Sequence, residues 1–280
     1  MTDMKLAVIS DIHANLPALE AVLQDVDAWE PDFVVVAGDV VNRGPRPREC
    51  LHLILERQQE SEWPYLIGNH EEYVLVHLAP DAPRSGPQFE LYRYSYWTLQ
   101  QLGEDVRYIS DLPFCLLLEE ERDIAYITHA SPRSTRDGLY PHMSDDELRA
   151  RVPDAIPLLA VGHTHRAFIR RVDPTLVVNA GSVGLPFDHD PRAGYARLYW
   201  DRERWRGEIR RIPYDRERAE RDFYETGFLE EAGPLARLIF IEFKKAQSQL
   251  YQWTMAYRDK VLSGEMTIEE AVEAFIREGN

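Results

Sequence analysis

The sequence predicts a protein of the α/β class, and two observations carry that prediction. Five short runs rich in Val, Ile and Leu lack strict alternation of polar and apolar residues, which is typical of strands covered on both faces. Stretches with helical periodicity lie between these runs, as expected where strands and helices alternate along the chain. The runs are residues 6–10, 33–37, 65–67, 124–128 and 158–161.

The segment between the first two runs predicts an amphipathic helix. Asn15 is a suitable N-cap, and Pro17 fits the first helical turn, where a missing backbone donor costs nothing. Such a helix returns the chain so that the second run starts as a parallel neighbour of the first. A second helix is predicted over residues 48–60. Apolar residues recur at helical spacing in the first helix, at Leu16, Leu19, Val22, Leu23 and Val26.

Residues 77–112 separate the third run from the fourth. They begin with a Pro-rich loop and continue as an aromatic-rich helix that we expect to end near Gly103. The segment could form a lid over a substrate, or its aromatic side chains could pack in the core. The sequence leaves both interpretations open.

The chain is expected to divide into a domain of residues 1–212, which carries the five runs, and a helical extension of residues 213–280. Thr267 and Glu270 predict the capping box of a final helix in this extension. The extension packs either on the first domain or against a second subunit, which would produce a homo-oligomer.

Residues of the types that bind metal ions follow all five runs. Because the ends of such strands gather at one rim of a sheet, we expect these side chains to form one site. Two carboxylates, one amide and four imidazoles are a donor set that suits Mn²⁺, Zn²⁺, Fe or Ni and is poor for Ca²⁺. The residues are Asp11, His13, Asp39, Asn69, His129, His163 and His165.

One ion cannot use seven protein donors and still admit a substrate, whereas two ions that share one aspartate can. Two divalent ions against two carboxylates leave a local charge of about +2, which attracts an anionic substrate. Taken singly, Asp11 could cap a helix, and Asp39 or Asn69 could lie in an ordinary turn. If the fifth run continued as a strand, His163 and His165 would point to one face.

The order Asp-x-His, Gly-Asp, Gly-Asn-His-Glu, His and Gly-His-x-His closely resembles the calcineurin-like metallophosphoesterase superfamily. The stretches SDIHANLPALEAVL, GNHE, ITHASP, GHTH and VVNAGSVG look most like its small bacterial and archaeal phosphodiesterase branch. The resemblance implies a four-layer α/β/β/α sandwich, in which two mixed sheets are flanked by helices. It also implies one ion on Asp11, His13 and His165, a second on Asn69, His129 and His163, and a bridging Asp39.

Two more residues gain a role from the resemblance. His70 would be a catalytic side chain, although a surface-loop histidine or a residue at a helix N-terminus is the alternative. Glu71 could orient His70, or it could simply begin a helix. Arg43 lies in a segment that resembles the GDxxxRG block of the protein-phosphatase branch, where the arginine grips phosphate. A solvated loop arginine is the alternative for Arg43.

The predicted function is a dinuclear metal-dependent phosphoesterase that hydrolyses phosphodiester bonds. Water bridging two ions would attack phosphorus as hydroxide, and His70 would assist the leaving group. Mn²⁺ is favoured, with Fe, Zn, Ni or Co as alternatives. The runner-up is a phosphomonoesterase acting on a phosphoprotein or a nucleotide, and a metal-binding scaffold without catalysis is the third interpretation.

The amino-acid composition limits the kinds of molecule that the protein is expected to bind. The 280 residues carry 32 Lys and Arg against 48 Asp and Glu, a formal charge of −16, which argues against binding of extended nucleic acid. A small phosphate ester, with nucleotides among the candidates, remains compatible with a locally positive site. Without a signal peptide or an apolar run that could cross a bilayer, and with Cys50 and Cys115 expected as free thiols, we expect a cytoplasmic protein and no membrane partner.

One later block departs from the pattern of the branch. Leu185 and Phe187 stand where relatives commonly have Gln and Arg, which could reflect a more apolar leaving group or only loop packing. His189 could extend the site or lie in a surface loop.

Overall fold

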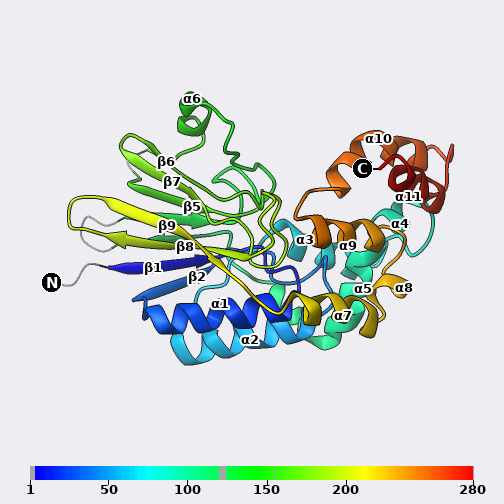
Figure 1. Cartoon of the computed structure of the whole chain (residues 1–280), viewed down its shortest axis with the longest axis horizontal. Helices are drawn as coiled ribbons and strands as arrows, with labels where there is room; N and C mark the ends of the chain where they lie inside the picture. The colour runs from blue at the N-terminus through cyan, green and yellow to red at the C-terminus, as the bar shows by residue number, and fades with distance from the viewer. Residues whose placement is uncertain (1–3, 120–123, 155, 280) are drawn as a thin grey trace.

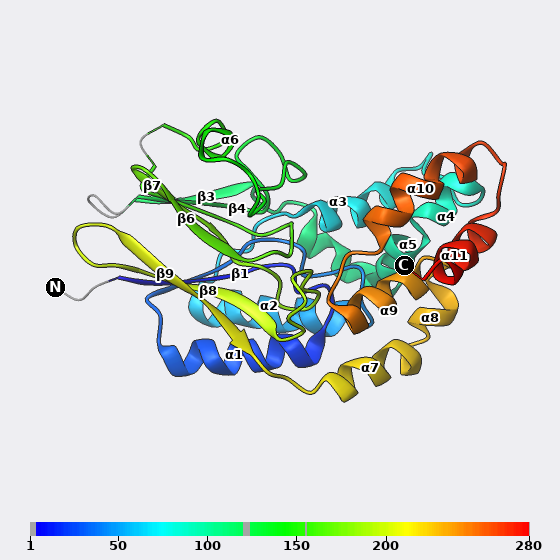
Figure 2. The same cartoon turned by 45° about the horizontal axis from the view of Figure 1, so that its top comes forward.

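Two mixed β-sheets lie face to face, and helices α1 and α2 cover the outer side of one of them (Figures 1 and 2). The computed structural model describes residues 4–119, 124–154 and 156–279. Helix α6 (Asp145–Arg149) lies on the outer side of the other sheet, and further helices gather at the end of the molecule opposite the N-terminus. The predicted α/β class, with two mixed sheets flanked by helices, is confirmed.

The first sheet has the strand order β2-β1-β8-β9. Strands β1 (Lys5–Ile9) and β2 (Phe33–Val36) are parallel, and β8 (Ala193–Trp200) and β9 (Trp205–Ile212) continue the sheet antiparallel. The parallel pair needs a crossover, which α1 (Leu16–Trp29) provides as predicted. The Asn15 side chain caps α1 by accepting from the backbone N–H of Ala18 at 3.3 Å. Helix α2 (Pro47–Ser61) matches the second predicted helix.

The second sheet has the order β3-β4-β5-β7-β6. Its three central strands, β4 (Ala125–Thr128), β5 (Leu158–Val161) and β7 (Thr175–Asn179), are parallel. The edge strands β3 (Cys115–Leu118) and β6 (Phe168–Val172) are antiparallel to their neighbours. Both sheets therefore send parallel strands toward the same end of the sandwich, where the predicted ligands follow them.

Apolar side chains from both sheets fill the space between them, because the inner face of each sheet must be removed from water. Trp205 is the largest of these side chains and is fully buried. This core comprises Leu6, Val8, Val35, Ala37, Leu66, Ala125, Ile127, Leu158, Ala160, Leu176, Val178, Ala180, Ala196, Leu198 and Trp205.

The segment after the third run forms α3 (Asn69–Leu75), the 3₁₀ turn η1 (Val76–Leu78), α4 (Pro87–Leu91), α5 (Arg93–Leu102) and the 3₁₀ segment η2 (Gly103–Ile109). The aromatic helix ends at Gly103 as expected, but it is broken at Tyr92. Trp97 and Leu102 are buried in the core, so the core-packing interpretation holds for part of the segment. Its function as a lid stays a prediction.

The helical extension packs on this chain itself. Residues from the extension share an apolar cluster with Leu91, Tyr94 and Trp97 of α4 and α5. Packing against a second subunit stays a prediction. The helices are α7 (Arg216–Glu225), α8 (Phe228–Glu231), α9 (Ala236–Lys245), α10 (Leu250–Leu262) and α11 (Ile268–Arg277). Thr267 and Glu270 form the expected capping box of α11.

The third predicted strand is wrong. Residues 65–67 make one isolated bridge, in which Tyr65 pairs with Val36, and no regular strand. The run is only three residues long, and the chain enters α3 at Asn69, so no ladder can extend.

Both cysteines are free, with Cys50 buried and Cys115 partly buried, as expected for thiols rather than a disulfide. Among the described residues, every helix is too short or too polar to span a bilayer.

Candidate metal centre

Six of the seven predicted ligands follow parallel strands, and the seventh, Asn69, stands at the start of a helix. Asp11 and His13 follow β1, Asp39 follows β2, His129 follows β4, and His163 follows β5. The remaining two are His165, in the loop after β5, and Asn69, which opens α3.

Close approach of these loops depends on glycine. A Cβ on Gly68 would come within 2.2 Å of Asp39 Oδ1, and one on Gly162 within 2.4 Å of Asp11 Oδ2. The Gly residues in the Gly-Asn-His-Glu and Gly-His-x-His motifs are therefore needed because no side chain fits there.

Five of the predicted ligands have a left-handed backbone, which is uncommon for residues other than glycine. Their φ angles lie between 46° and 67°. Such conformations store strain and persist where the surrounding structure enforces them, which occurs mostly at functional sites. The five are Asp11, His13, Asp39, His163 and His165.

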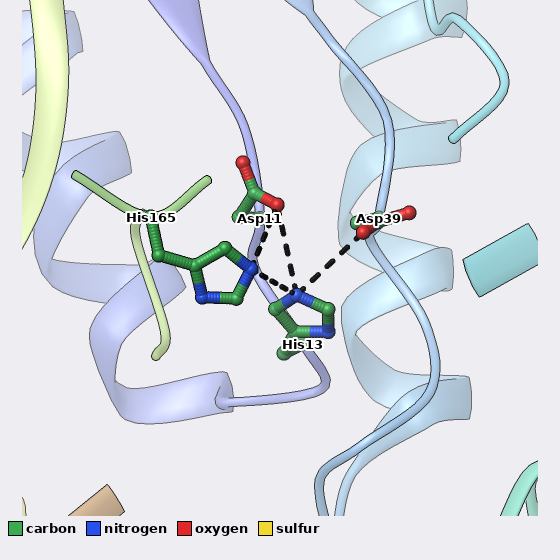
Figure 3. Close-up of side chains that lie close together, drawn as sticks. All are labelled: Asp11, His13, Asp39 and His165. Carbon is green, nitrogen blue, oxygen red and sulfur yellow. Dashed lines mark hydrogen bonds and ion pairs between the residues drawn. The ribbon is translucent and has the colours of Figure 1, made fainter. Parts of the chain in front are cut away.

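Four of the side chains converge in a first group. Figure 3 shows Asp11, His13, Asp39 and His165 with their donor atoms turned toward one another. His13 Nε2 lies 3.1 Å from His165 Nε2 and 3.7 Å from Asp39 Oδ2, and His165 Nε2 lies 3.1 Å from Asp11 Oδ1. The four donor atoms all lie within 4.8 Å of one another, so they could hold one ion.

A second group contains Asp39 again, now with His129 and His163. His129 Nε2 lies 3.3 Å from Asp39 Oδ2. Asn69 Oδ1 lies 2.9 Å from His129 Nε2 and 2.8 Å from His163 Nδ1, which places the predicted amide ligand in the same group. The structure thus brings all seven residues together, and Asp39 belongs to both groups.

Backbone carbonyls fix the orientation of three of these imidazoles. His13 Nδ1 faces the carbonyl of Asn42 at 3.2 Å, and His129 Nδ1 faces that of Ala37 at 2.8 Å. His165 Nδ1 makes the same contact with the carbonyl of Leu185. Each Nδ1 therefore donates, and Nε2, which faces the carboxylates, is the nitrogen that would bind a metal ion, as in histidines of metal sites.

The carboxylates themselves support a cation at this position. Asp11 Oδ1 and Asp39 Oδ2 are buried, and neither has a hydrogen-bond partner in the described part of the chain. A buried anionic oxygen without a partner is costly unless a cation compensates it. The donor chemistry and these two oxygens therefore fit divalent ions.

The pKa shifts in the second group also fit a bound cation. Although burial opposes ionisation of Asp39, the facing His129 and His70 hold the pKa of its carboxyl far below the ordinary value. Burial lowers the pKa of His129, but Asp39 outweighs it and raises that pKa to about 10. A proton on His129 thus compensates the carboxylate, and a bound cation would displace that proton. His163 is ready to bind as a neutral imidazole, because burial and His129 lower its pKa to about 4.

The expectation that His163 and His165 lie on a continuing strand is wrong. Strand β5 ends at Val161, and both histidines have left-handed φ angles in the loop that follows. Because a turn separates them, the two imidazoles enter different groups, instead of sharing one strand face.

His70 stands in the first turn of α3, as the helix alternative expected, and its side chain lies beside both groups. It is buried rather than exposed on a surface loop, with 6% of its surface accessible. Its ring meets that of His13 edge-on, with the centroids 4.9 Å apart. Asn42 donates from Nδ2 to His70 Nδ1 at 3.0 Å, and helix α5 fixes this amide through Ser95 and Thr98. The amide orientation follows from this network, and it leaves the His70 proton on Nε2. The sequence analysis missed Asn42, because its partner is 28 residues away.

Glu71 organises the backbone around the centre. Its carboxylate accepts from the N–H groups of Asp39 and Val40, each at 2.8 Å, and from that of Gly68 at 2.9 Å. It also accepts from the Tyr65 hydroxyl at 2.8 Å. Burial raises the pKa of Glu71 to about 7, with a further contribution from Asp39. Glu71 stands in the first turn of α3, so the helix-start interpretation is correct. Its carboxylate also joins the loop after β2 to the residue that precedes α3.

We expect Glu71→Ala to destabilise the fold by at least about 3 kcal/mol, because several buried donors lose their acceptor in either protonation state of the glutamate. This corresponds to a Tm lower by roughly 6 °C or more. Glu72→Ala is the matched control, since Glu72 is the next residue of α3 and its side chain is 30% exposed. Thermal unfolding followed by circular dichroism measures both. An equal loss in the two variants would contradict this role.

Arg43 is buried, with 8% of its surface accessible, so the solvated-loop interpretation does not describe it. Its Nη2 pairs with Glu242 of α9, a fully buried residue 199 positions away. The other Glu242 oxygen accepts from the N–H groups of Gln249 and Leu250 at the start of α10. The extension therefore holds the arginine predicted to bind phosphate, which no local sequence pattern could show.

The block that differs from the pattern of the branch, around Leu185, Phe187 and His189, lies next to the first group. Phe187 stacks on His165, with the centroids 4.3 Å apart, and also faces Arg43. Leu185 is buried and accounts for loop packing, whereas Phe187 lines the cavity described next. His189 contacts Gln247 and lies outside both groups.

A cavity of about 620 Å³ opens in front of the centre. Its lining includes Asn69 and His163 of the second group together with His70 and Arg43. Further lining comes from α4, from the residues around Tyr94, and from α10. A cavity of this size next to buried cation-binding groups can admit a small anionic substrate.

Comparisons with known proteins agree with this geometry. A family model for the calcineurin-like phosphoesterase superfamily domain matches residues 4–203. The chain is 30% identical over 239 residues to the uncharacterized protein MJ0912 of Methanocaldococcus jannaschii, covering 78% of this chain and 91% of that protein. A shorter segment of 43 residues is 49% identical to the phosphodiesterase YfcE of Escherichia coli K12, covering 15% of this chain and 23% of that protein.

Solved structures show the same relationship. The metallophosphoesterase from Sphaerobacter thermophilus superposes with a TM-score of 0.69 at 30% identity, covering 88% of this chain and all of that one (100%). Protein PH1004 from Pyrococcus horikoshii OT3 has a TM-score of 0.71 at 22% identity, covering 83% and 97%, and shares the fold.

Proposed function

The chain belongs to the calcineurin-like phosphoesterase superfamily and is a hydrolase of phosphate ester bonds, and from this premise we propose that it is a dinuclear phosphodiesterase. The observation that carries the proposal is the pair of donor groups that share Asp39 beside His70. One ion would be held by Asp11, His13 and His165, and the other by Asn69, His129 and His163. Mn²⁺ is the favoured metal, because the donor set mixes nitrogen and oxygen.

Such ions, when bound, supply an activated water nucleophile and neutralise charge on the phosphoryl group. The protein supplies the rest. His70 presents Nε2–H to the leaving oxygen and stabilises its developing charge, while Asn42 fixes the imidazole by donating to Nδ1. Arg43, held by Glu242, lies where its remaining N–H groups can contact a phosphoryl oxygen.

A diester is favoured over a monoester by the resemblance of the motifs to the phosphodiesterase branch and by the local match to YfcE. A phosphomonoesterase is the second candidate, because Arg43 is positioned to add positive charge for a dianionic phosphate. The formal charge of −16 favours a small substrate over extended nucleic acid.

The test is hydrolysis of bis(p-nitrophenyl) phosphate and p-nitrophenyl phosphate by protein stripped of metal and reloaded with Mn²⁺. We expect turnover only after reloading, with the diester preferred. Preference for the monoester would establish the second candidate and make Arg43 the next residue to change. Two bound ions without turnover of either ester would favour a non-catalytic scaffold.

A further inference from the structure

The cavity in front of the metal centre is walled by two distant parts of the chain. Tyr140 and Arg166 belong to loops of the sheet domain, whereas Tyr251 and Arg258 belong to α10 of the helical extension. Figure 2 shows α10 on the same side of the molecule as α3, which carries His70. The extension therefore contributes to the substrate cavity as well as to the apolar cluster of the fold.

Arg166 is half-buried, and within the described ranges no carboxylate or other acceptor pairs with its guanidinium. Other partly buried arginines in this acidic chain have partners, as Arg197 has Asp25 and Arg218 has Glu20. A partly desolvated cation without a counter-ion is unfavourable for folding alone. Arg166 lines the cavity, where a bound anionic ligand would supply the missing counter-ion.

Arg258, on α10, provides a second cation in the cavity lining. Its only ion pair among the described residues is with Asp259, at 3.6 Å, and that carboxylate is 94% exposed. An exposed pair of this kind contributes little and leaves the guanidinium available. The two arginines thus add positive charge to the cavity beyond the metal centre itself.

Two tyrosines also line the cavity. Tyr251, on α10, is 68% exposed although it is a large aromatic residue. Tyr140 is half-buried, and its ring lies against that of His142, with the centroids 5.3 Å apart. Aromatic faces exposed in a cavity bind planar rings by stacking.

We propose that this cavity binds the part of the substrate beyond the scissile phosphate and selects a nucleotide that carries a second phosphate. Tyr140 and Tyr251 contact the base, and Arg166 and Arg258 bind the second phosphate. The volume of about 620 Å³ suits a ligand of this size. The inference rests on the proposed phosphoesterase function, because it assigns the scissile phosphate to the metal centre.

The test measures binding rather than turnover. Calorimetric titration of the Mn²⁺-loaded protein compares ribose 5-phosphate, adenosine monophosphate and α,β-methylene adenosine diphosphate, which differ in turn by the base and by a second phosphate. Phosphate release is followed in parallel, so that hydrolysis during the titration is detected. We expect each addition to tighten binding by at least about tenfold.

Variants then assign each preference. Arg166→Gln and Arg258→Gln should remove most of the advantage of the methylene diphosphate over the monophosphate. Arg221→Gln, an exposed change on α7 outside the cavity lining, should keep it. Tyr251→Ala should remove the advantage of the monophosphate over ribose 5-phosphate, whereas Tyr224→Ala, which changes a residue 59% exposed on α7, should not. Metal content is measured for every variant, because Arg166 follows His165.

Equal affinity for the three probes, absence of binding, or preferences that survive in the cavity variants would overturn the assignment. Failure of the proposed function gives a different result. In that case the protein would show these binding preferences but hydrolyse no phosphate ester. Turnover of the chromogenic diester with equal affinities for the probes would retain the function and reject the nucleotide cavity.

Discussion

Replacing Asp39 by asparagine is expected to lower kcat/KM for a phosphodiester by at least about 10³-fold. Loss of a residue that only orients a metal ligand already costs about 10- to 100-fold in metal affinity or activity. Asp39 is itself a donor in both groups, so its loss affects two ions. Its Oδ1 accepts from the backbone N–H of His70 at 2.8 Å, and Oδ2 faces His129 Nε2 at 3.3 Å. An amide has no negative charge to share between two cations, and its nitrogen cannot replace the second carboxylate oxygen as a metal ligand.

The measurement is turnover of the diester together with elemental analysis of bound Mn²⁺. Metal content should fall along with activity, while circular dichroism should show a folded protein. Asp146→Asn is the control, because the Asp146 side chain on α6 is 94% exposed and outside both groups. Wild-type activity in the Asp39 variant would show that no catalytic ion depends on this carboxylate.

Replacing His70 by glutamine is expected to lower kcat by roughly 10²- to 10⁴-fold, the usual contribution of a well-placed proton donor. The metal content should stay close to that of the wild type, since His70 lies outside both donor groups. The Nε2–H of His70 is fixed by Asn42, and a glutamine cannot present a donor at the same point. The effect should therefore fall on the chemical step more than on KM.

The dependence on the leaving group distinguishes this role from a structural one. The loss should be larger for methyl phenyl phosphate, which must expel phenolate, than for methyl p-nitrophenyl phosphate, which expels the better leaving group p-nitrophenolate, because a poor leaving group needs the proton donor more. His52→Gln serves as control, since the His52 side chain is 47% exposed on α2 and pairs with Asp105. An equal loss for both leaving groups, or loss of bound metal, would assign His70 to the architecture of the site.

Most elements could be predicted because their signals are local. The cap at Asn15 and the spacing of Leu19, Val22 and Val26 specify α1 without reference to any other part of the chain. The strand predicted at residues 65–67 was wrong because a local signal was not enough there. Three apolar residues resemble a strand locally, but their pairing depends on Val36, which is distant in the sequence.

The sequence by itself determined the α/β class, the seven donor residues and the chemistry that such donors support. Ligand chemistry depends on residue type, and strand ends depend on short apolar runs, so both can be recognised in order along the chain. The family resemblance implied the division of the donors into two groups around Asp39, and the structure shows the side chains arranged in that way. Only the tertiary structure decided that the loop after β5 separates His163 from His165.

The tertiary structure alone also revealed the supports of the site. Asn42 fixes His70, and Glu242 holds Arg43 across 199 residues. The contribution of α10 to the cavity lining was likewise visible only in the structure. The physical reason is that these contacts are made between segments brought together by packing, where burial and hydrogen-bond geometry select the partner and no spacing in the sequence records it.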